Sequence, residues 1–491
     1  MNEHIQGLNR DQTLLFPDVL EKYVDEENPV RFIDAFVDTL NLEKMGFTHS
    51  TPTDTGRPSY DPKVLLKIYI YGYLNQVRSS RKLEKECHRN IEVIWLTKKL
   101  APDHKTIADF RKDNVDCVKA VFHEFVKVCM RLDLYGAQFI AIDGVKFKAV
   151  NSPERNLNQK KLQGRLNAID ESVAKYINYM EAIDREEEKQ GDKRAELQEN
   201  VKMLLSKKEE YAEVLKSLKA SSQNEVSFTD PDCRLMRSNR GKMEPGYNSH
   251  IAVDDKNHLI VDYNVTNNSS DFNELSPLAK SAKETLKVKS IEVATDKGFF
   301  TDLEIKRCVD EGVVPYVPEP KRHGPDLKKC GVPTPDFYIE KFVYDKLSDS
   351  YVCPAGNRML FQCTVSRLGK VMRMYRSNAC FSCRFFGTSC TSNRHGRIIE
   401  RWEYEELLED MRMRLRFHPE KMGARQAVVE HVFGTIKRPF NQGYFLLKGL
   451  EKVWGEVGFT MLAYNLRRAL NILGSRVLVA SLGRHGAGKF C

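Results

Sequence analysis

The spacing of apolar residues divides the chain into a helical region and a region of mixed strands and helices. Residues 1–133 repeat apolar positions at steps of three and four, as in Val30, Ile33 and Val37, and this spacing predicts amphipathic helices. From residue 134, short apolar runs such as Phe139–Ile142 end in polar turns and predict buried strands. Because strand and helix patterns alternate beyond this point, they predict a mixed sheet with helices packed on it. The expected fold class is therefore α/β, preceded by an all-α N-terminal domain.

Two stretches with other patterns interrupt the predicted sheet region. In residues 153–225, two sets of apolar residues at helical spacing flank the charged run DREEEKQGDKRAE, which predicts an antiparallel helical hairpin. Such a hairpin is either an arm for dimerisation or DNA clamping, or a solvated insertion. Residues 336–395 show little helical pattern and many Pro, Gly, Cys and basic residues, so we interpret them as a Cys-rich insertion. The sheet region then comprises residues 134–152, 226–335 and 396–474, and we expect a disordered tail at 475–491.

Composition narrows the class of protein further. The 491 residues are 41% hydrophobic and 30% charged, as in a folded globular protein, and a chain of this length normally forms more than one domain. Its net charge of +9 and pI near 8.8 favour a polyanionic partner such as nucleic acid. No stretch has the pattern of a signal peptide or a membrane span, so the 12 cysteines indicate thiols or a metal site in a reducing compartment. We expect a cytoplasmic protein without a membrane partner.

One predicted helix of the N-terminal domain is strongly basic. Its positive residues are Arg78, Arg81, Lys82, Lys85 and Arg89. A basic helix among short helices suits contact with a DNA backbone, whose phosphates bind arginine and lysine. The same residues are equally typical of the solvated face of an ordinary helical bundle, and the sequence leaves both interpretations open.

Three carboxylates occupy similar settings in the sheet region. Asp143 ends the run Phe139–Ile142, Asp296 ends a second predicted strand in VATDKGFF, and Glu430 lies on a predicted helix in VVEHVFGTIKR. A single strand-end aspartate often only begins a turn, but three converging carboxylates repel each other unless divalent cations lie among them. Two Mg²⁺ (or Mn²⁺) ions about 3.5–4 Å apart can activate a nucleophile and stabilise the leaving oxygen of a phosphoryl transfer. Basic residues near the acids that can contact phosphates are Lys146, Lys297, Lys437 and Arg438.

Four cysteines of the Cys-rich insertion have spacings that suit a tetrahedral metal. They are Cys353, which begins a CPxG turn, Cys380 and Cys383, which form a CxxC pair, and Cys390. Four thiolates match a structural zinc site, although a single CxxC pair is only half of the strong double pattern. Cys363 or His395 can replace one of the four ligands in this interpretation. The alternative is that all of these cysteines are ordinary thiols.

Taken together, these segments resemble the bacterial insertion-sequence transposases of the DDE type. The resemblance covers nearly the whole chain and is carried by TGRPSYDPKVLLKIYIYGYLNQVRSSRKLEKECHRN, APDHKTIADFRKDN, AIDGVKFKAVNS, TDPDCRLM with GYNSHIAVD, VATDKGFF, and VEHVFGTIKR with GYFLLKGLEKV. It implies an RNase H-like mixed sheet as the catalytic core and binding of transposon ends by the N-terminal part. The family's three metal-binding acids map onto Asp143, Asp296 and Glu430, and its lysine on the acidic helix maps onto Lys437.

One family pattern is not kept in this sequence. In the Tyr-x-x-Arg-x-x-x-Glu pattern that precedes the helical acid, Gly423 and Gln426 stand at the Tyr and Arg positions, and Arg425 is one place early.

From the resemblance we expect a transposase that cuts insertion-sequence ends and joins the freed 3′-hydroxyls to target DNA, as a homodimer assembled on DNA. The alternatives are an inactive, transposase-derived DNA-binding protein and an RNase H-like nuclease without strand transfer.

Overall fold

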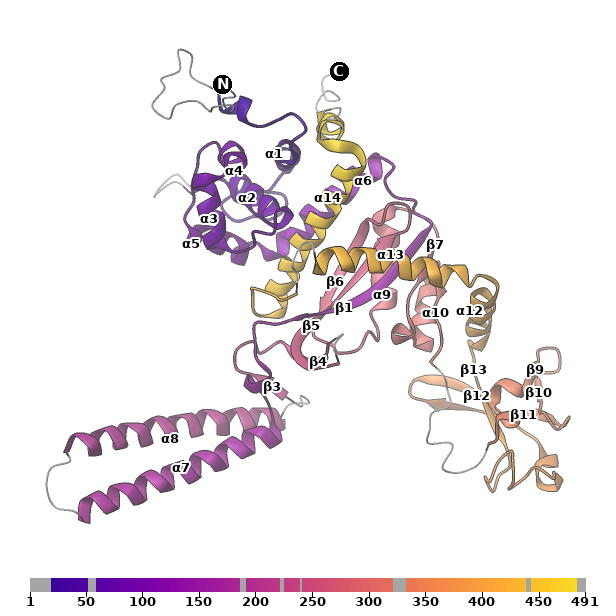
Figure 1. Cartoon of the computed structure of the whole chain (residues 1–491). Helices are drawn as coiled ribbons and strands as arrows, with labels where there is room; N and C mark the ends of the chain where they lie inside the picture. Colours follow the sequence, from indigo (N-terminus) through magenta and orange to yellow (C-terminus); the bar gives the residue numbers. More distant parts are fainter. Residues whose placement is uncertain are drawn as a thin grey trace, which may run out of the picture. The chain divides into compact units, whose positions relative to one another are not determined.

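The computed structural model describes residues 19–51, 59–185, 191–220, 225–238, 241–320, 333–438 and 443–483. Over these residues the chain is a mixed α/β protein with a helical N-terminal region, as the sequence predicts (Figure 1). The chain divides into two compact units: unit 1 comprises Met1–Ala137, Asp143–Ser270 and Ala427–Cys491, and unit 2 comprises Gln138–Ile142 and Asp271–Gln426. Strand β1 (Phe139–Lys148) and helix α13 (Glu420–Lys437) contribute residues to both units.

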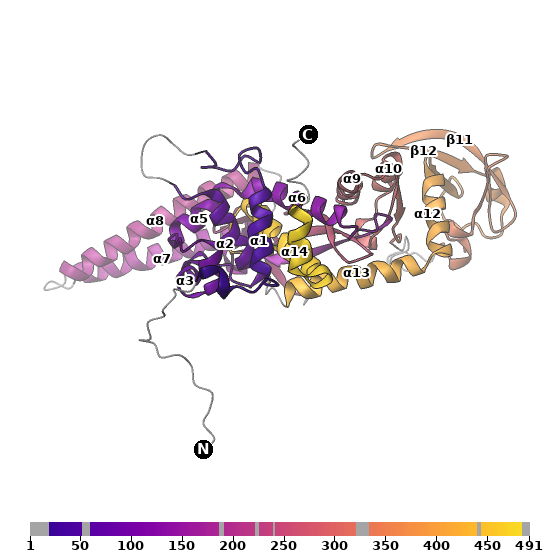
Figure 2. The same ribbon diagram turned by 90° about the horizontal axis from the view of Figure 1, so that it is seen from above.

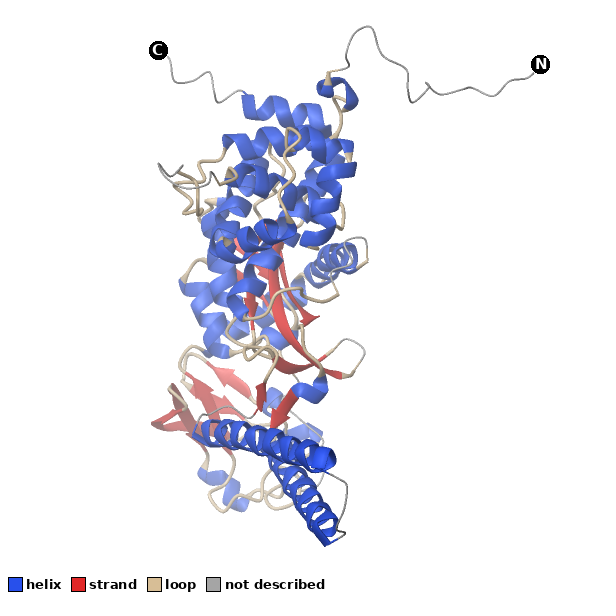
Figure 3. Ribbon diagram, turned by 90° about the vertical axis from the view of Figure 1, so that its left-hand side faces the viewer, coloured by secondary structure: helices blue, strands red, loops and turns tan. Residues whose placement is uncertain are grey.

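The N-terminal region of unit 1 consists of short helices and has no strand among its described residues (Figure 3). The helices are α1 (Pro29–Thr39), α2 (Pro62–Leu74), α3 (Ser80–Arg89), α4 (Ile91–Leu96), α5 (His104–Asp113) and α6 (Val118–Arg131). Side-chain oxygens of Asn28, Asp61 and Asp103 accept backbone N–H groups at the starts of α1, α2 and α5, which stabilises these N-termini. No helix in the described part of the chain is long and apolar enough to cross a membrane.

The long helix α14 (Leu450–Gly483) joins the N-terminal helices to the sheet of unit 1. It packs against α1, α2 and α6, and against strand β6 (Ile260–Thr266) (Figure 2). The ring of Phe459 stacks on Tyr69 and Tyr73 of α2, with ring centroids 5.3 and 5.2 Å apart. On the sheet side, a Cβ atom on Gly458 would lie 2.3 Å from the hydroxyl oxygen of Tyr263. The helix therefore reaches β6 at this distance only because residue 458 is glycine.

The C-terminal part of α14 contradicts the prediction of a disordered tail from residue 475. Gly474 has a φ of 76°, which glycine adopts without strain, and the residues after it are again helical up to Gly483. They stay ordered because Ser475 and Leu478 are buried, and the Ser475 hydroxyl donates to the carbonyl oxygen of Asn28 (3.0 Å). The prediction is wrong for residues 475–483, where packing outweighs the break at glycine, and residues 484–491 lie outside the described chain.

The strands of unit 1 are β4 (Arg234–Arg237), β5 (Met243–Asp254), β6 and the second part of β1. Strand β5 is central: it pairs with β1 on one edge, and antiparallel with β4 and then β6 along the other. Helix α14 is fixed to this sheet by Asn465, whose side chain donates to the carbonyl oxygen of Ile260 (2.7 Å) and accepts from its N–H (2.8 Å). A side-chain amide thus continues the backbone pairing of an edge strand.

The predicted helical hairpin is also part of unit 1. Its helices are α7 (Gln159–Arg185) and α8 (Gly191–Ala220), and the short strands β2 (Asn156–Asn158) and β3 (Glu225–Ser227) pair antiparallel at its base. The buried apolar residues gather near that base and are Leu157, Leu162, Leu166, Leu215 and Leu218. Apolar residues farther along the two helices are exposed, among them Ile177, Tyr179, Met203 and Leu205. The described part of the hairpin is therefore anchored at its base and exposes apolar side chains farther along both helices.

In unit 2 the first part of β1 lies in a parallel sheet. It pairs with β7 (Ile291–Ala294), which pairs with β8 (Val313–Tyr316). Helices α9 (Leu275–Leu286) and α10 (Asp302–Asp310) pack against each other and against β8, and α12 (Glu405–Phe417) packs on α10 and β8. The buried Glu304 on α10 joins α9 and α10, because its Oε2 accepts the N–H of Ser276 (2.8 Å).

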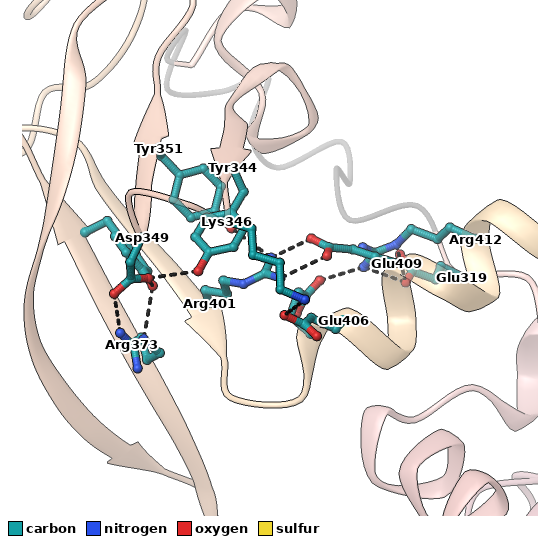
Figure 4. Close-up of polar contacts among 12 residues, drawn as sticks. Glu319, Tyr344, Lys346, Asp349, Tyr351, Arg373, Arg401, Glu406, Glu409 and Arg412 are labelled. Atoms are coloured by element: carbon teal, nitrogen blue, oxygen red, sulfur yellow. Dashed lines mark hydrogen bonds and ion pairs between the residues drawn. The ribbon is translucent and has the colours of Figure 1, made fainter.

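The predicted Cys-rich insertion contains a five-stranded antiparallel sheet that the sequence pattern did not indicate. The strands, in the order β13-β12-β11-β10-β9, are β9 (Val343–Asp345), β10 (Ser350–Val352), β11 (Arg358–Arg367), β12 (Lys370–Arg376) and β13 (Ile398–Trp402). Strand β13 lies beyond the predicted boundary at residue 395. Figure 4 shows that Arg401 on β13 connects this sheet to α12: its guanidinium lies 3.9 Å from the ring centroid of Tyr344 and donates to Glu409 Oε2 (2.9 Å).

Candidate active site

Asp143 lies where β1 changes from a fully buried strand to an alternating one. The four preceding residues, Phe139–Ile142, are all buried, whereas Asp143 and Gly144 are partly buried. The N–H of Gly144 donates to Asp143 Oδ1 (2.8 Å), which holds the carboxylate against its own backbone. This hydrogen bond fixes the orientation of one carboxylate oxygen relative to β1.

Asp296 follows β7 after the buried Thr295 and caps the short 3₁₀ helix η4 (Lys297–Phe299). Its Oδ1 accepts the N–H of Gly298 (2.8 Å). A Cβ atom on Gly298 would lie 3.0 Å from Asp296 Oδ1 and 3.2 Å from Asp271 Oδ2, so the absence of a side chain lets two carboxylates approach this turn. Asp271 is not among the predicted site residues. A helix and a strand separate it from Asp296 along the chain, so no local pattern could have indicated it.

The strands that precede the two aspartates share one register. Ala141 of β1 is the parallel partner of Ala294 of β7, and each alanine is followed two residues later by an aspartate. In parallel pairing, the carboxyl ends of neighbouring strands point to the same edge of the sheet, which is where open α/β sheets bind their ligands. Asp296 therefore follows the end of β7, as the sequence predicts. The prediction that Asp143 ends a strand is wrong, because β1 continues to Lys148 and also pairs with β5. The pairing of β1 with β7 ends at Ala141, so Asp143 lies just beyond the paired residues.

Helix α13 carries Glu430 and Lys437, which are seven residues apart and project from one face. Glu430 is exposed, and Lys437 is partly buried. Burial lowers the pKa of Lys437, and the negative charge of Asp143 acts in the opposite direction. An effect of this kind requires proximity, so unit 1 brings Lys437 and Asp143 together although 294 positions separate their numbers along the chain.

A histidine pair lies next to Glu430 and was not predicted from the sequence. The rings of His258 and His431 meet edge to face with centroids 5.1 Å apart. His431 Nδ1 lies 3.2 Å from the hydroxyl oxygen of Tyr464, which donates to the carbonyl oxygen of His258 (2.9 Å). Burial lowers the pKa of both histidines, and the positive charge of Arg468 lowers both further. Both imidazoles are therefore mainly neutral at pH 7.

The basic residues predicted near the acids are placed differently from one another. Lys146 is three positions beyond Asp143 on β1, so the alternation of a strand directs the two side chains to opposite faces. Lys297 directly follows Asp296 and is exposed, and Arg438 follows Lys437 and is also exposed. Lys297 and Arg438 are thus accessible to a phosphate near the acids, whereas Lys146 does not share the face of Asp143.

The basic helix α3 is present, but it begins at Ser80, after Arg78. Arg78 is 7% exposed and forms an ion pair (3.2 Å) with Glu456 of α14, which is fully buried. Its guanidinium also lies 5.0 Å from the ring centroid of Tyr444 and donates to the carbonyl oxygen of that residue (3.0 Å). These contacts contradict the prediction that Arg78 binds DNA, because the side chain stabilises the interior of unit 1. The other predicted basic residues are exposed and are Arg81, Lys82, Lys85 and Arg89.

The four cysteines predicted as zinc ligands line one cavity of about 20 Å³ in unit 2. They are Cys353, Cys380, Cys383 and Cys390, and all four are free thiols. The two substitutes considered from sequence are elsewhere: Cys363 is exposed on β11, and His395 is exposed with its Nε2 accepting from Arg394 (3.0 Å). Among the residues that the structure describes, no group of three or more His, Cys, Asp or Glu side chains is arranged as a metal site.

Two family models match two separate ranges of the chain. The family model described as "Transposase domain (DUF772)" matches residues 18–113, and the model described as "Transposase DDE domain" matches residues 228–466. The chain belongs to the DDE transposases. Among solved structures, it is similar to a piggyBac transposase seen by cryo-electron microscopy in a synaptic complex with hairpin DNA, with 9% identity, a TM-score of 0.30, and coverage of 94% of this chain and 82% of that chain. No match was found among curated proteins.

The two matched ranges divide the candidate residues of this DDE transposase. Asp296, Glu430 and Lys437 lie within the range that matches the DDE domain, and helix α3 lies within the first range. Asp143 lies between the two ranges. Its assignment therefore depends on the register of β1 with β7 and on its proximity to Lys437.

Proposed function

We propose that this DDE transposase cuts the ends of an insertion sequence and transfers the freed 3′ ends to target DNA. The observation that carries the proposal is the parallel pairing of Ala141 with Ala294 in a chain of this family. An aspartate stands two residues after each of these alanines. Both steps exchange an oxygen at phosphorus. Water first cleaves the strand and leaves a 3′-hydroxyl, and that hydroxyl then attacks a target phosphodiester, so one P–O bond forms for each one broken.

The acids of the proposed site suit hard divalent cations. Asp143, Asp296 and Glu430 offer carboxylate oxygens, the donors that Mg²⁺ and Mn²⁺ prefer, and we assign them two such ions. When bound, the ions activate the attacking oxygen and stabilise the leaving oxygen. The chain contributes orientation, because the N–H groups of Gly144 and Gly298 each hold one oxygen of the adjacent aspartate.

Lys437 is assigned to a phosphate oxygen of the strand that is cut. Burial alone would favour its neutral form, but the charge of Asp143 supports the ammonium. A charged lysine binds phosphate as a point charge, and its place next to an acid keeps it at the reacting phosphate. The exposed Lys297 and Arg438 are assigned to neighbouring phosphates of the same DNA.

End binding is assigned to the N-terminal helices, with α3 against the DNA backbone. Support comes from its exposed basic residues and from the net charge of +9 over the whole chain. An insertion sequence has two ends, and both have to be cut in one event. We therefore assign a homodimer assembled on DNA, with one catalytic centre acting on each end.

A combined cleavage and joining assay tests this function against the two alternatives. The substrate is labelled DNA taken from both sides of the coding sequence, incubated with the protein, Mg²⁺ and a supercoiled plasmid. Labelled 3′ ends joined to the plasmid support the proposal. Cleavage without joining, at any plasmid concentration, indicates a nuclease instead. Binding without cleavage indicates an inactive, transposase-derived DNA-binding protein.

A further inference from the structure

We propose that Cys353, Cys380, Cys383 and Cys390 bind one structural zinc ion that closes the five-stranded sheet region of unit 2. Binding replaces water on the ion by four sulfur ligands, and each thiol that becomes a thiolate releases its proton to solvent. The proposal concerns the folding of this region and does not rest on the transposase function.

The cavity shared by the four thiols is small, and several of its other lining residues are aromatic. Its volume of about 20 Å³ is near the minimum for one water molecule. Rings of Phe337, Phe342 and Phe386 contribute to its lining, so part of the wall around a bound ion would be apolar. The four sulfur atoms line this cavity but, within the described chain, are not arranged as metal ligands. Rotation about χ1 can move each cysteine sulfur toward a bound ion while the backbone stays in place.

Tight turns present each of the four cysteines to the cavity. After β10, the N–H of Gly356 donates to the carbonyl oxygen of Cys353 (2.8 Å). In the CxxC pair, the N–H of Cys383 donates to the carbonyl oxygen of Cys380 (3.2 Å), and Cys390 is held by its own N–H, which donates to Phe385 (3.0 Å). The backbone is therefore held by hydrogen bonds at Cys353, at the CxxC pair and at Cys390, and side-chain rotation alone would have to complete the ligand geometry.

Two further residues fit a cluster of thiolates better than a cluster of neutral thiols. Gly396 has a φ of 78°, and a Cβ atom there would lie 2.9 Å from Cys380 Cβ, so glycine permits a close approach of the chain to one ligand. Arg397 lines the cavity, and within the described chain its Nε is buried without a hydrogen-bond partner. The positive charge of Arg397 is balanced when the neighbouring cysteines become negatively charged thiolates.

The electrostatics explain why a cation is needed. Four thiolates around one small cavity repel each other unless a cation neutralises them, and Zn²⁺ with four sulfur ligands meets this requirement. If the thiols instead only fill the core, no metal is retained and Arg397 keeps an unmatched buried charge.

The proposed site would connect two loops that the sheet leaves separate. Cys353 lies between β10 and β11, whereas the other three lie in the segment between β12 and β13. Cys353 and Cys390 also pack against the apolar cluster of this sheet, which includes Tyr351, Met359 and Tyr375. Zinc would therefore tie the β12–β13 segment to the core of a sheet that has few buried residues.

The test is elemental analysis of the full-length protein after incubation with ZnCl₂ and desalting. We expect about one zinc per chain in the parent and in Cys363→Ser, the matched control from the same sheet, and none in Cys380→Ser. Because Cys380→Ser can also unfold the region, the parent itself provides a second readout. Replacement of zinc by Co²⁺ should give the visible absorption of tetrahedral sulfur ligation.

Two outcomes overturn the proposal. One is folded parent protein that retains no zinc and whose four thiols react equally fast with and without a chelator, which makes them ordinary core thiols. The other is freshly isolated parent protein with disulfides among the four cysteines. Retention of zinc by Cys380→Ser at the parental level would likewise remove that residue from the site.

Discussion

Ala141 of β1 is the parallel partner of Ala294 of β7, and Asp143 and Asp296 follow them at the same interval of two residues. Parallel register is a property of backbone pairing, so it relates the two acids without any contact between their side chains. The relationship explains how segments far apart in the sequence can supply the first two acids of one proposed site.

Replacement of Lys437 should lower the rate of cleavage and leave end binding nearly unchanged. In Lys437→Ala the proposed phosphate contact is lost, and a loss of one such stabilising group typically costs on the order of 10²-fold in rate. Lys437→Arg should restore part of the activity, since it keeps the charge but changes its reach. The measurement is single-turnover cleavage, with the exposed Lys448→Ala as control. Parental rates in Lys437→Ala would remove this lysine from the reaction.

Replacement of Arg81 and Lys85 should weaken DNA binding and reduce its salt dependence. Both side chains are exposed on α3 and lie four residues apart on one face. Each lost phosphate contact should lower the slope of log affinity against log salt by about 0.9. The affinities for end DNA and for random DNA should fall by similar factors, because phosphates carry no sequence information. A salt titration of the double alanine variant tests this, with Lys289→Ala/Lys346→Ala as a control that removes two exposed charges from unit 2. Equal slopes for parent and variant would place the contact elsewhere.

Arg78 should behave as a structural residue in spite of its basic neighbours. Arg78→Met leaves Glu456 buried without its ion-pair partner, and breaking such a pair typically costs about 3–5 kcal/mol. Burial raises the pKa of Glu456, and Arg111 and Arg78 oppose this rise. In Arg78→Met/Glu456→Gln the loss of stability should therefore be smaller than the sum of the two single losses. Urea unfolding measures these differences. A stable Arg78→Met variant with weakened DNA binding would reverse the assignment.

The histidine pair should make stability depend on pH below neutrality. The folded-state pKa values of His258 and His431 are lowered from 6.5, so the unfolded chain binds protons first as the pH falls. The free energy of unfolding should therefore decrease from about pH 6.5 downward, and this decrease should stop once the pH passes below the folded-state values. His258→Asn/His431→Asn should remove this component, which urea unfolding at a series of pH values measures. An unchanged pH dependence in the double variant would assign it to other groups.

The sequence predicted those parts of the fold and site that depend on local pattern. The apolar run before Asp143 marks a buried strand, the turn at Asp296 marks a strand end, and the seven-residue spacing of Glu430 and Lys437 marks one helical face. These features follow from the geometry of a strand and a helix alone. The helical hairpin was predictable for the same reason, because its two arms repeat apolar residues at helical spacing. The continuation of β1 past Asp143 to Lys148 was not predicted.

Contacts between distant segments could not be predicted in this way. Arg78 belongs by composition to a basic helix, but its buried partner Glu456 is far away in the sequence and only tertiary packing brings them together. The helix after Gly474 persists because Ser475 and Leu478 are buried by other segments. Asp271, His258 and their neighbours near the acids lie on turns whose partners no local pattern reveals.

The central claim is that Asp143 and Asp296 act in the chemistry of DNA cleavage. The most direct measurement compares Mg²⁺-dependent cleavage of labelled end DNA by Asp143→Asn and Asp296→Asn with cleavage by Asp255→Asn, a control at an exposed aspartate on the β5–β6 turn. The account predicts no cleavage by the first two variants, parental cleavage by the control, and end binding by all three that is equal to or tighter than that of the parent, since each change removes a negative charge. Parental cleavage by either Asp143→Asn or Asp296→Asn would contradict it.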